Sequence, residues 1–158
     1  MTHGSLDPEA PAAGPPGDRP ADGGTLDVIA FGTVFLELVF GHVPRLPGPG
    51  EEVFTDEFAV SCGGCVIMAT AAQRAGLQAG LCTLLGDDLG TTVVTEHCRR
   101  AGVDMSTCTK VSGDATGITT VMNFDDERAF VSYLPPQAWR PRRDPRRWLD
   151  VLRERRPP

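Results

Sequence analysis

Two segments in the middle of the chain have a helical composition, and each is followed directly by a glycine. Residues 65–75 are rich in alanine and contain no proline before Gly76, and residues 91–101 end in the same way at Gly102. A glycine after the last turn is a common helix end, because it adopts the left-handed conformation without a Cβ clash. Residues 78–85, a short apolar run between the two helices, are predicted as a strand. This alternation indicates an α/β fold with a parallel sheet.

Further strands are expected on both sides of this unit. The segments that we predict as strands are residues 26–31, 34–40, 52–61, 107–111, 117–124 and 128–133. The last two flank a short polar turn, which predicts a hairpin. The predicted strands before residue 65 and this hairpin do not fit a plain doubly wound sheet. We therefore expect a small accessory sheet beside the main one.

The composition changes near both ends of the chain. Residues 1–24 hold five prolines and a single leucine, so they cannot bury enough apolar surface to offset the entropy of ordering. We expect a disordered leader there, a domain over residues 25–136, and an Arg/Pro-rich tail over residues 137–158. The leader lacks the apolar segment of a secretory signal, and no apolar run approaches the ~20 residues that span a bilayer. The sequence therefore predicts a soluble, cytoplasmic protein.

Charge is distributed unevenly along the chain. Residues 1–139 carry 18 acidic and 7 basic side chains, whereas residues 140–158 carry 8 arginines and 3 acidic residues, which gives the net charge of −6. An acidic body argues against nucleic acid as the main partner, because phosphate binding needs clustered lysine and arginine. The arginine-rich tail is interpreted as a solvated segment, with anion binding as the alternative.

The five cysteines are an odd number, and without a secretion signal reduced thiols are expected. Cys62 and Cys65 form a C-x-x-C motif directly before the first predicted helix. A helix N-terminus lowers the pKa of a thiol, so a redox role for this pair is one functional alternative. A zinc site is not expected, because there is no second C-x-x-C and the histidines lack ligand spacing.

Six motifs occur in an order and spacing that resemble the N-terminal half of a known kinase family. They are Gly32 to Glu37 (similar to G-D/S-x-x-x-D), Leu46 to Glu51 (P-x-P-G-E), Gly63-Gly64 leading to Ala75-Gly76 (G-G…N…A…L-G), Gly86 to Gly90 (G-D-D-x-x-G), Ala101 to Asp104 (G-V-D at a helix end) and Thr116-Gly117 (T-G). Together they cover about residues 26–135. On these motifs the chain resembles the ribokinase-type, or pfkB, carbohydrate kinases.

The resemblance implies the N-terminal part of a ribokinase-like three-layer α/β sandwich with a small β-sheet lid. It also implies phosphorylation of a sugar or nucleoside by ATP with Mg²⁺, and a possible homodimer through the lid sheet. That family keeps its catalytic base, in a G-A-G-D motif, and most of its ATP site in the C-terminal half. Neither that motif nor a P-loop occurs here. We therefore expect a truncated form unable to catalyse alone, with no catalytic, ATP or Mg²⁺ site in this chain.

Four residues are candidates for sugar binding through the resemblance. Glu37 stands where the family has an aspartate, and its carboxylate could accept hydrogen bonds from two hydroxyls. Gly63 and Gly64 would let the backbone approach a ligand and expose N–H groups to it, although a tight strand-to-helix turn would explain them equally well. Ile67 takes the place of the family's sugar-binding asparagine. We expect Glu37 and the glycines to converge at the carboxyl ends of the strands.

A non-catalytic module remains an alternative to the kinase. In that reading the chain binds a sugar or forms dimers, with residues 34–40 as an exposed apolar strand edge that favours association. The identity of the sugar stays open.

Overall fold

The computed structural model describes residues 25–136 and residue 153, so the predicted leader and nearly all of the predicted tail lie outside the described residues. The elements, in chain order, are β1 (Val28–Phe31), β2 (Val34–Gly41), β3 (Glu57–Gly64), α1 (Cys65–Arg74), β4 (Ala79–Cys82), β5 (Leu84–Leu85), α2 (Leu89–Ala101), β6 (Thr109–Lys110), β7 (Gly117–Asn123) and β8 (Arg128–Tyr133). The α/β class predicted from the sequence is confirmed.

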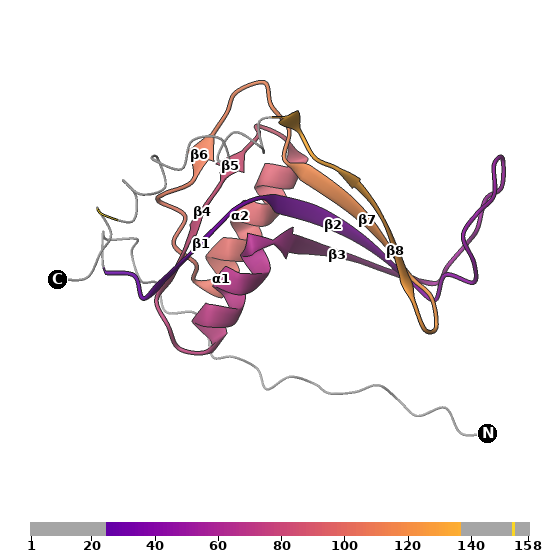
Figure 1. Ribbon diagram of the computed structural model, residues 1–158, viewed down its shortest axis with the longest axis horizontal. Helices are drawn as coiled ribbons and strands as arrows, with labels where there is room; N and C mark the ends of the chain where they lie inside the picture. Colours follow the sequence, from indigo (N-terminus) through magenta and orange to yellow (C-terminus); the bar gives the residue numbers. More distant parts are fainter. Residues whose placement is uncertain (1–24, 137–152, 154–158) are drawn as a thin grey trace.

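Two pairs of parallel strands and both helices form what we call the α/β part. Strand β1 pairs with β4, and β5 pairs with β6. Helix α1 lies against β1 and β4, and α2 lies beside α1 and also contacts β2 and β3 (Figure 1). Leu81 from β4, Val66 and Ala69 from α1, and Val94 and Cys98 from α2 are fully buried where these elements meet. The core of the molecule therefore sits mainly in the α/β part, and Val34 of β2 and Cys62 of β3 also belong to it.

The remaining long strands form a four-stranded sheet in the order β3-β2-β7-β8, which we call the lid sheet. Strand β2 is antiparallel to β3 and parallel to β7, and β7 and β8 form the predicted hairpin. The lid sheet extends from the α/β part as a long curved arm that ends in the loop after β2 (Figure 1). It is the accessory sheet expected from the sequence, and it is larger than expected.

Both helices end as predicted. Gly76 follows α1 with a φ of 87°, and Gly102 is the C-cap of α2 with a φ of 73° in the left-handed region. At the other end of α2, Asp88 is the N-cap, and its side chain accepts a hydrogen bond from the backbone N–H of Thr91. No helix of the described residues is long and apolar enough to cross a membrane.

Two predictions about the strands were wrong. Strand β3 begins at Glu57 rather than at residue 52 and continues to Gly64, so the glycine pair belongs to a strand. Strand β2 lies between β3 and β7, so residues 34–40 are not an exposed edge. The reason is a pairing between distant segments, since β7 lies about 80 residues further along the chain and covers the flank of β2.

Candidate functional site

Glu37 and Gly63 come together across the β2–β3 strand pair. Glu37 is opposite Ser61 in the register, which makes Gly63 its diagonal neighbour on the same face of the lid sheet. A Cβ on Gly63 would run into the Glu37 carboxylate and would lie 3.1 Å from its Cγ. The half-buried carboxylate therefore occupies the space that any other residue at position 63 would fill.

Gly64 ends β3 and is the N-cap of α1, with φ 69° and ψ −140°. A side chain here would meet the carbonyl oxygen of Thr33. That same oxygen accepts hydrogen bonds from the Cys65 backbone N–H at 3.0 Å and from the Cys65 thiol at 3.2 Å. The glycine therefore allows the start of β2 and the start of α1 to be tied together.

The N-terminus of α1 carries neither a side-chain cap nor an acidic residue in its first turn. The N–H groups at the start of a helix have no partner within the helix. Here they follow directly after Gly63 and Gly64, beside a face that carries the Glu37 carboxylate. The arrangement combines a hydrogen-bond acceptor with backbone donors, which suits a ligand with hydroxyl groups.

Ile67 lies in the first turn of α1, and its side chain is 55% exposed. The buried face of this helix is formed by Val66, Ala69 and Thr70, so Ile67 points away from the core. Met68 beside it is also exposed. The first turn therefore presents aliphatic and thioether groups where a polar side chain would offer hydrogen bonds.

The position expected for Glu37 requires a correction. The sequence suggested a carboxylate at the end of the first strand of the main sheet, in a crevice at the carboxyl ends of the strands. Glu37 lies instead in the middle of β2, inside the lid sheet, and its pairing neighbours are Ser61 and Thr119. Of the four candidates, Glu37 and Gly63 are brought into contact, Gly64 adjoins them, and Ile67 follows in the first helical turn.

The geometry speaks against a redox role for Cys62 and Cys65. All five cysteines are free thiols. Cys62 lies in the hydrophobic core, where burial raises its pKa to about 11 and the negative charge of Glu37 adds to the rise. Burial likewise raises the pKa of Cys65 to about 12. A redox pair needs a lowered pKa, so the helix N-terminus does not activate these thiols.

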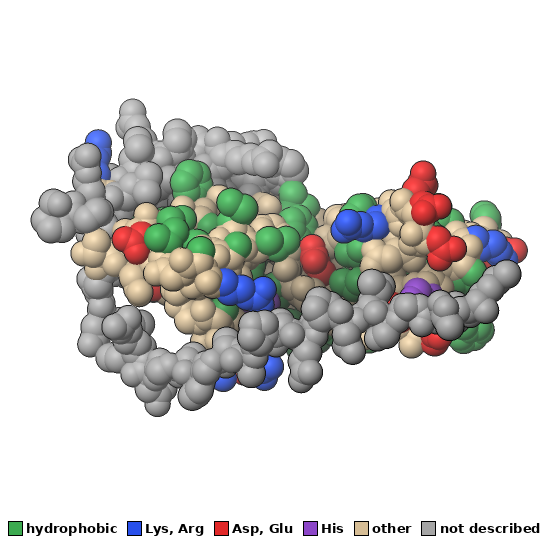
Figure 2. Space-filling view, turned by 90° about the horizontal axis from the view of Figure 1, so that it is seen from below, with side chains coloured by type: hydrophobic (Ala, Val, Ile, Leu, Met, Phe, Trp, Pro, Cys, Tyr) green, Lys and Arg blue, Asp and Glu red, His purple; other side chains and the backbone are tan. Residues whose placement is uncertain are grey.

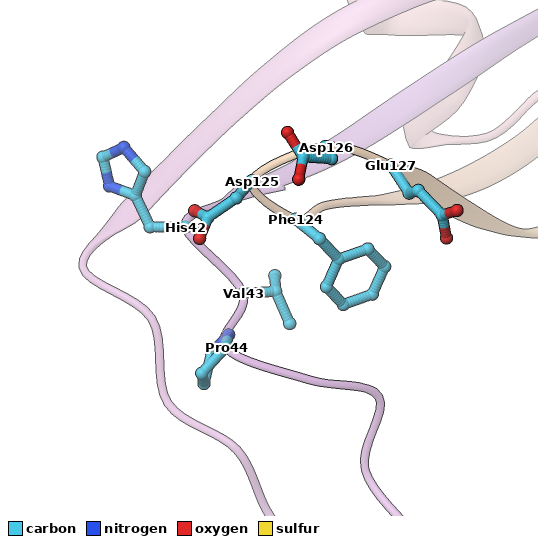
Figure 3. Close-up of a pocket in the computed structure, with 7 residues that line it drawn as sticks. All are labelled: His42, Val43, Pro44, Phe124, Asp125, Asp126 and Glu127. Atoms are coloured by element: carbon cyan, nitrogen blue, oxygen red, sulfur yellow. The ribbon is translucent and has the colours of Figure 1, made fainter.

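A hollow at the far end of the lid sheet was not anticipated from the sequence. It is lined by His42, Val43, Pro44, Phe124, Asp125, Asp126 and Glu127. Val43 lies beside Phe124, and the acidic residues come from the β7–β8 turn (Figure 3). Acidic side chains gather at this end of the molecule (Figure 2). It is separated from Glu37 by several residues of β2, about 3.3 Å each, so it is distinct from the Glu37–Gly63 site.

Comparison with known proteins places the chain in a family. A family model described as pfkB family carbohydrate kinase matches residues 27–149, a range that includes the first part of the predicted tail. Among solved structures, a putative ribokinase from Agrobacterium tumefaciens is similar at 24% identity and a TM-score of 0.65, over 73% of this chain and 38% of that one.

Two further ribokinase structures are also similar. Ribokinase from Cryptococcus neoformans var. grubii serotype A, in complex with ADP, has 28% identity and a TM-score of 0.58, over 67% of this chain and 34% of that one. Arabidopsis thaliana ribokinase, complexed with ribose and ATP, has 18% identity and a TM-score of 0.61, over 70% and 36%. The chain thus spans little more than a third of the length of these structures. It belongs to the pfkB family of carbohydrate kinases.

Proposed function

We propose that the Glu37–Gly63 site contacts the sugar in a pfkB-type kinase, which phosphorylates a sugar or a nucleoside with ATP and Mg²⁺. The observation that carries this proposal is the Glu37 carboxylate placed over Gly63, directly before the N-terminus of α1. A sugar hydroxyl both donates and accepts hydrogen bonds. Glu37 would accept from such hydroxyls, and the backbone N–H groups of the first turn of α1 would donate to them.

The Glu37 carboxylate is available for this role. Within residues 25–136 no ion pair occupies it, whereas Glu51, Glu57 and Glu96 each have a cationic or histidine neighbour. A half-buried carboxylate has lost part of its hydration, and ligand hydroxyls can replace the lost donors. A bound sugar would supply those donors.

Ile67 sets a limit on how tightly the sugar is held. By resemblance to the family, Ile67 stands at the position of the sugar-binding asparagine. It is exposed in the first turn of α1. An isoleucine forms no hydrogen bond, so we propose that Ile67→Asn tightens sugar binding. A hydrogen bond contributes ~0.5–1.5 kcal/mol net, so the gain should be no more than about tenfold.

Sugar binding, rather than turnover, is the property that this chain can be tested for. None of the four candidate residues is a group that would bind ATP phosphates or, through the resemblance, the base that activates the sugar hydroxyl. In this proposal those groups come from the family's C-terminal half. Sugar-dependent ATP hydrolysis by the purified chain alone would contradict this division.

Calorimetry with ribose, fructose and adenosine tests the site directly. Glu37→Ala should weaken binding of the preferred ligand at least tenfold, because a buried donor–acceptor set loses its acceptor. Glu57→Ala is the matched control, because Glu57 also lies over a glycine, Gly41, at the opposite end of the same strand pair. The proposal fails if none of the three ligands binds, or if both variants weaken binding equally.

A dimer through the lid sheet is a second proposal, and it is supported by one apolar face. Leu38 is opposite Val60 and Thr120, and Thr120 is opposite Val131, so these side chains share a face. Val60 and Val131 are exposed there, as are Phe58 and Tyr133 on neighbouring rows. Light scattering should show a dimer that Val131→Asp converts to a monomer. A wild-type monomer at all concentrations would exclude this association.

A further inference from the structure

Thr116 marks the point where the lid sheet leaves the α/β part. It directly precedes β7, and it is only 1% exposed. Its backbone N–H donates to Asp88 Oδ2 at 2.9 Å, and its hydroxyl lies 2.7 Å from the hydroxyl of Thr91. Its Oγ1 also accepts a hydrogen bond from the Gly86 N–H at 3.1 Å. We call Asp88, Thr91 and Thr116 the root cluster.

The hydroxyl protons of the root cluster can be assigned. Thr91 donates its proton to the carbonyl oxygen of Gly86 at 2.7 Å. A hydroxyl has a single proton, so in the contact between the two hydroxyls Thr116 is the donor and Thr91 the acceptor. The Gly86 N–H donates back to Thr116. Thr116, Thr91 and the backbone of Gly86 thus form a closed ring of hydrogen bonds. The ring is buried, where an unpaired polar group would be costly.

The same junction has no room for additional side chains. A Cβ on Gly90, in the first turn of α2, would lie 3.0 Å from the Cβ of Thr116. A Cβ on Gly117 would lie 2.7 Å from Phe35 Cδ1 and 2.8 Å from the carbonyl oxygen of Val34. Helix α2, the start of β7 and the start of β2 are therefore in direct contact, without a flexible side chain between them.

This contact bears on the position of Glu37. Strand β7 pairs with β2 from the Phe35–Gly117 pair onward, which places Glu37 opposite Thr119. The position of β7 along α2 thus sets the position of β2. A second hydrogen bond holds the segment directly before β2, where the Thr83 hydroxyl donates to the Gly32 carbonyl at 2.7 Å.

We propose that Asp88, Thr91 and Thr116 are positioning residues that join the lid sheet to α2 as one unit and, through β7 and β2, hold the Glu37 carboxylate over Gly63. The consequence for sugar binding rests on the proposed function. The mechanical part of the proposal, that the three residues attach the lid sheet to α2, does not depend on the proposed function.

Hydrogen–deuterium exchange on Thr116→Val tests the mechanical part, because valine keeps the shape and removes the hydroxyl. Amides of residues 117–121 and 34–38 should exchange at least tenfold faster, while those of α1 and β4 keep their rates. Thr116→Ser retains a hydroxyl and should restore slow exchange. Thr70→Val is the matched control, since Thr70 is a buried threonine of α1 that bonds His97, away from the root cluster.

Three outcomes would overturn the proposal: no change in exchange, a uniform increase over the whole chain, or an equal effect of Thr70→Val on the lid sheet. If Thr116→Val does not fold, Asp88→Asn takes its place. An asparagine keeps only one acceptor for the two N–H groups of Thr91 and Thr116. It should give a smaller increase confined to the same strands, and an increase spread over α1 and β4 would also overturn the proposal.

The consequence for the site is measured as sugar affinity. Thr116→Val should weaken sugar binding about tenfold, and Thr116→Ser should restore it, although Thr116 does not belong to the sugar site. If the wild-type chain binds no sugar, the proposed function fails while the exchange result still decides the role of the root cluster. If the wild type binds and Thr116→Val binds equally well while its lid sheet exchanges faster, Glu37 is not positioned through β7.

Discussion

The α/β part and the lid sheet bury their apolar side chains to very different extents. In the α/β part, Leu81, Val66 and Val94 are completely buried between the strands and the two helices. In the lid sheet, Val131 is 66% exposed although it faces the same way as the apolar rows of β2 and β3. The base of the lid sheet shares the core through Val34 and Cys62, whereas its outer part is held mainly by backbone hydrogen bonds between its strands.

This difference separates the region with most of the packing from the region that holds the candidate site. The candidate site residue Glu37 lies in the region with little packing of its own, one strand away from the glycines that lead into the core. Strands without a covering layer are only marginally stable by themselves. The lid sheet therefore depends on its attachment to the α/β part, which is made at Thr116, at Thr33 and at Gly32.

The largest expected effect comes from removing a core side chain. Leu81→Ala should lower the free energy of unfolding by about 2–5 kcal/mol, because it removes buried methyl groups and leaves a cavity. Val131→Ala, on the exposed face of the lid sheet, should cost less than about 1 kcal/mol. Urea unfolding followed by circular dichroism measures both.

The comparison between the two regions breaks down if the two substitutions cost the same. Equal costs would mean that the lid face is covered in solution, as in the proposed dimer. Repeating the measurement at several protein concentrations separates these cases, because association makes the stability depend on concentration.

Local signals in the sequence predicted the helix ends of the α/β part and the β7–β8 hairpin of the lid sheet. The two helix ends follow from single glycines, Gly76 and Gly102, whose positive φ angles need no distant partner. The hairpin of β7 and β8 follows from a polar turn between two apolar runs. These predictions were confirmed because the residues that determine each feature are close together in the chain.

The arrangement of the lid sheet could not be predicted in the same way. Strand β2 pairs with β7, and no local pattern near residue 34 predicts a partner strand that begins at residue 117. The contact between Glu37 and Gly63 depends on the register of β2 and β3, where a shift of one residue would put Glu37 on the other face. The family motifs suggested the candidate residues, and the register determines which of them meet.

The base of the lid sheet lies inside the core, and thiol labelling should show it. Cys62 lies near the end of β3. Its raised pKa of about 11 leaves about two orders of magnitude less thiolate at pH 8 than an ordinary thiol has. Native Cys62 and Cys65 should therefore react with iodoacetamide at least 100-fold more slowly than in urea. Mass spectrometry of the labelled peptides measures this ratio. If native Cys62 and Cys65 are labelled as fast as in urea, their pKa values are not raised, and a redox role for the pair would be supported again.

A smaller effect is expected at the glycine that joins the lid sheet to α1. Gly64→Ala combines a positive φ with a collision against the Thr33 carbonyl, and it should cost about 3 kcal/mol. Gly50 also has a positive φ, but nothing lies within 4 Å of its added Cβ. Gly50→Ala should therefore cost only ~1 kcal/mol, from the backbone alone.

Thermal unfolding of the two alanine variants checks this difference. Similar losses would show that the Thr33 carbonyl moves aside, and that the tie between β2 and α1 is loose. In that case the attachment of the lid sheet would rest on the root cluster and on the hydrogen bond from Thr83 to Gly32.

The smallest expected effect is an acid-dependent loss of stability at Asp88. Burial raises the pKa of this carboxyl, but hydrogen bonds from Thr91 and Thr116 outweigh it, so the pKa lies below its usual value in the folded protein. A group with a lowered folded pKa stabilises the fold above its unfolded pKa of ~3.9, and this contribution is lost as the pH falls through the folded value. Asp88→Asn should therefore cost about 1 kcal/mol at pH 7 and less at pH 3.

Urea unfolding of the wild type and of Asp88→Asn at both pH values gives the sign of this dependence. Asp125→Asn, in the exposed turn between β7 and β8, is the control and should be neutral at both. Protonated Asp88 can no longer accept from both N–H groups, so acid should also lower the protection of the β7 amides, relative to their intrinsic exchange rates, before it affects β4. A difference that stays constant or grows between pH 7 and pH 3 would mean that Asp88 holds the lid sheet by its shape and not by its charge.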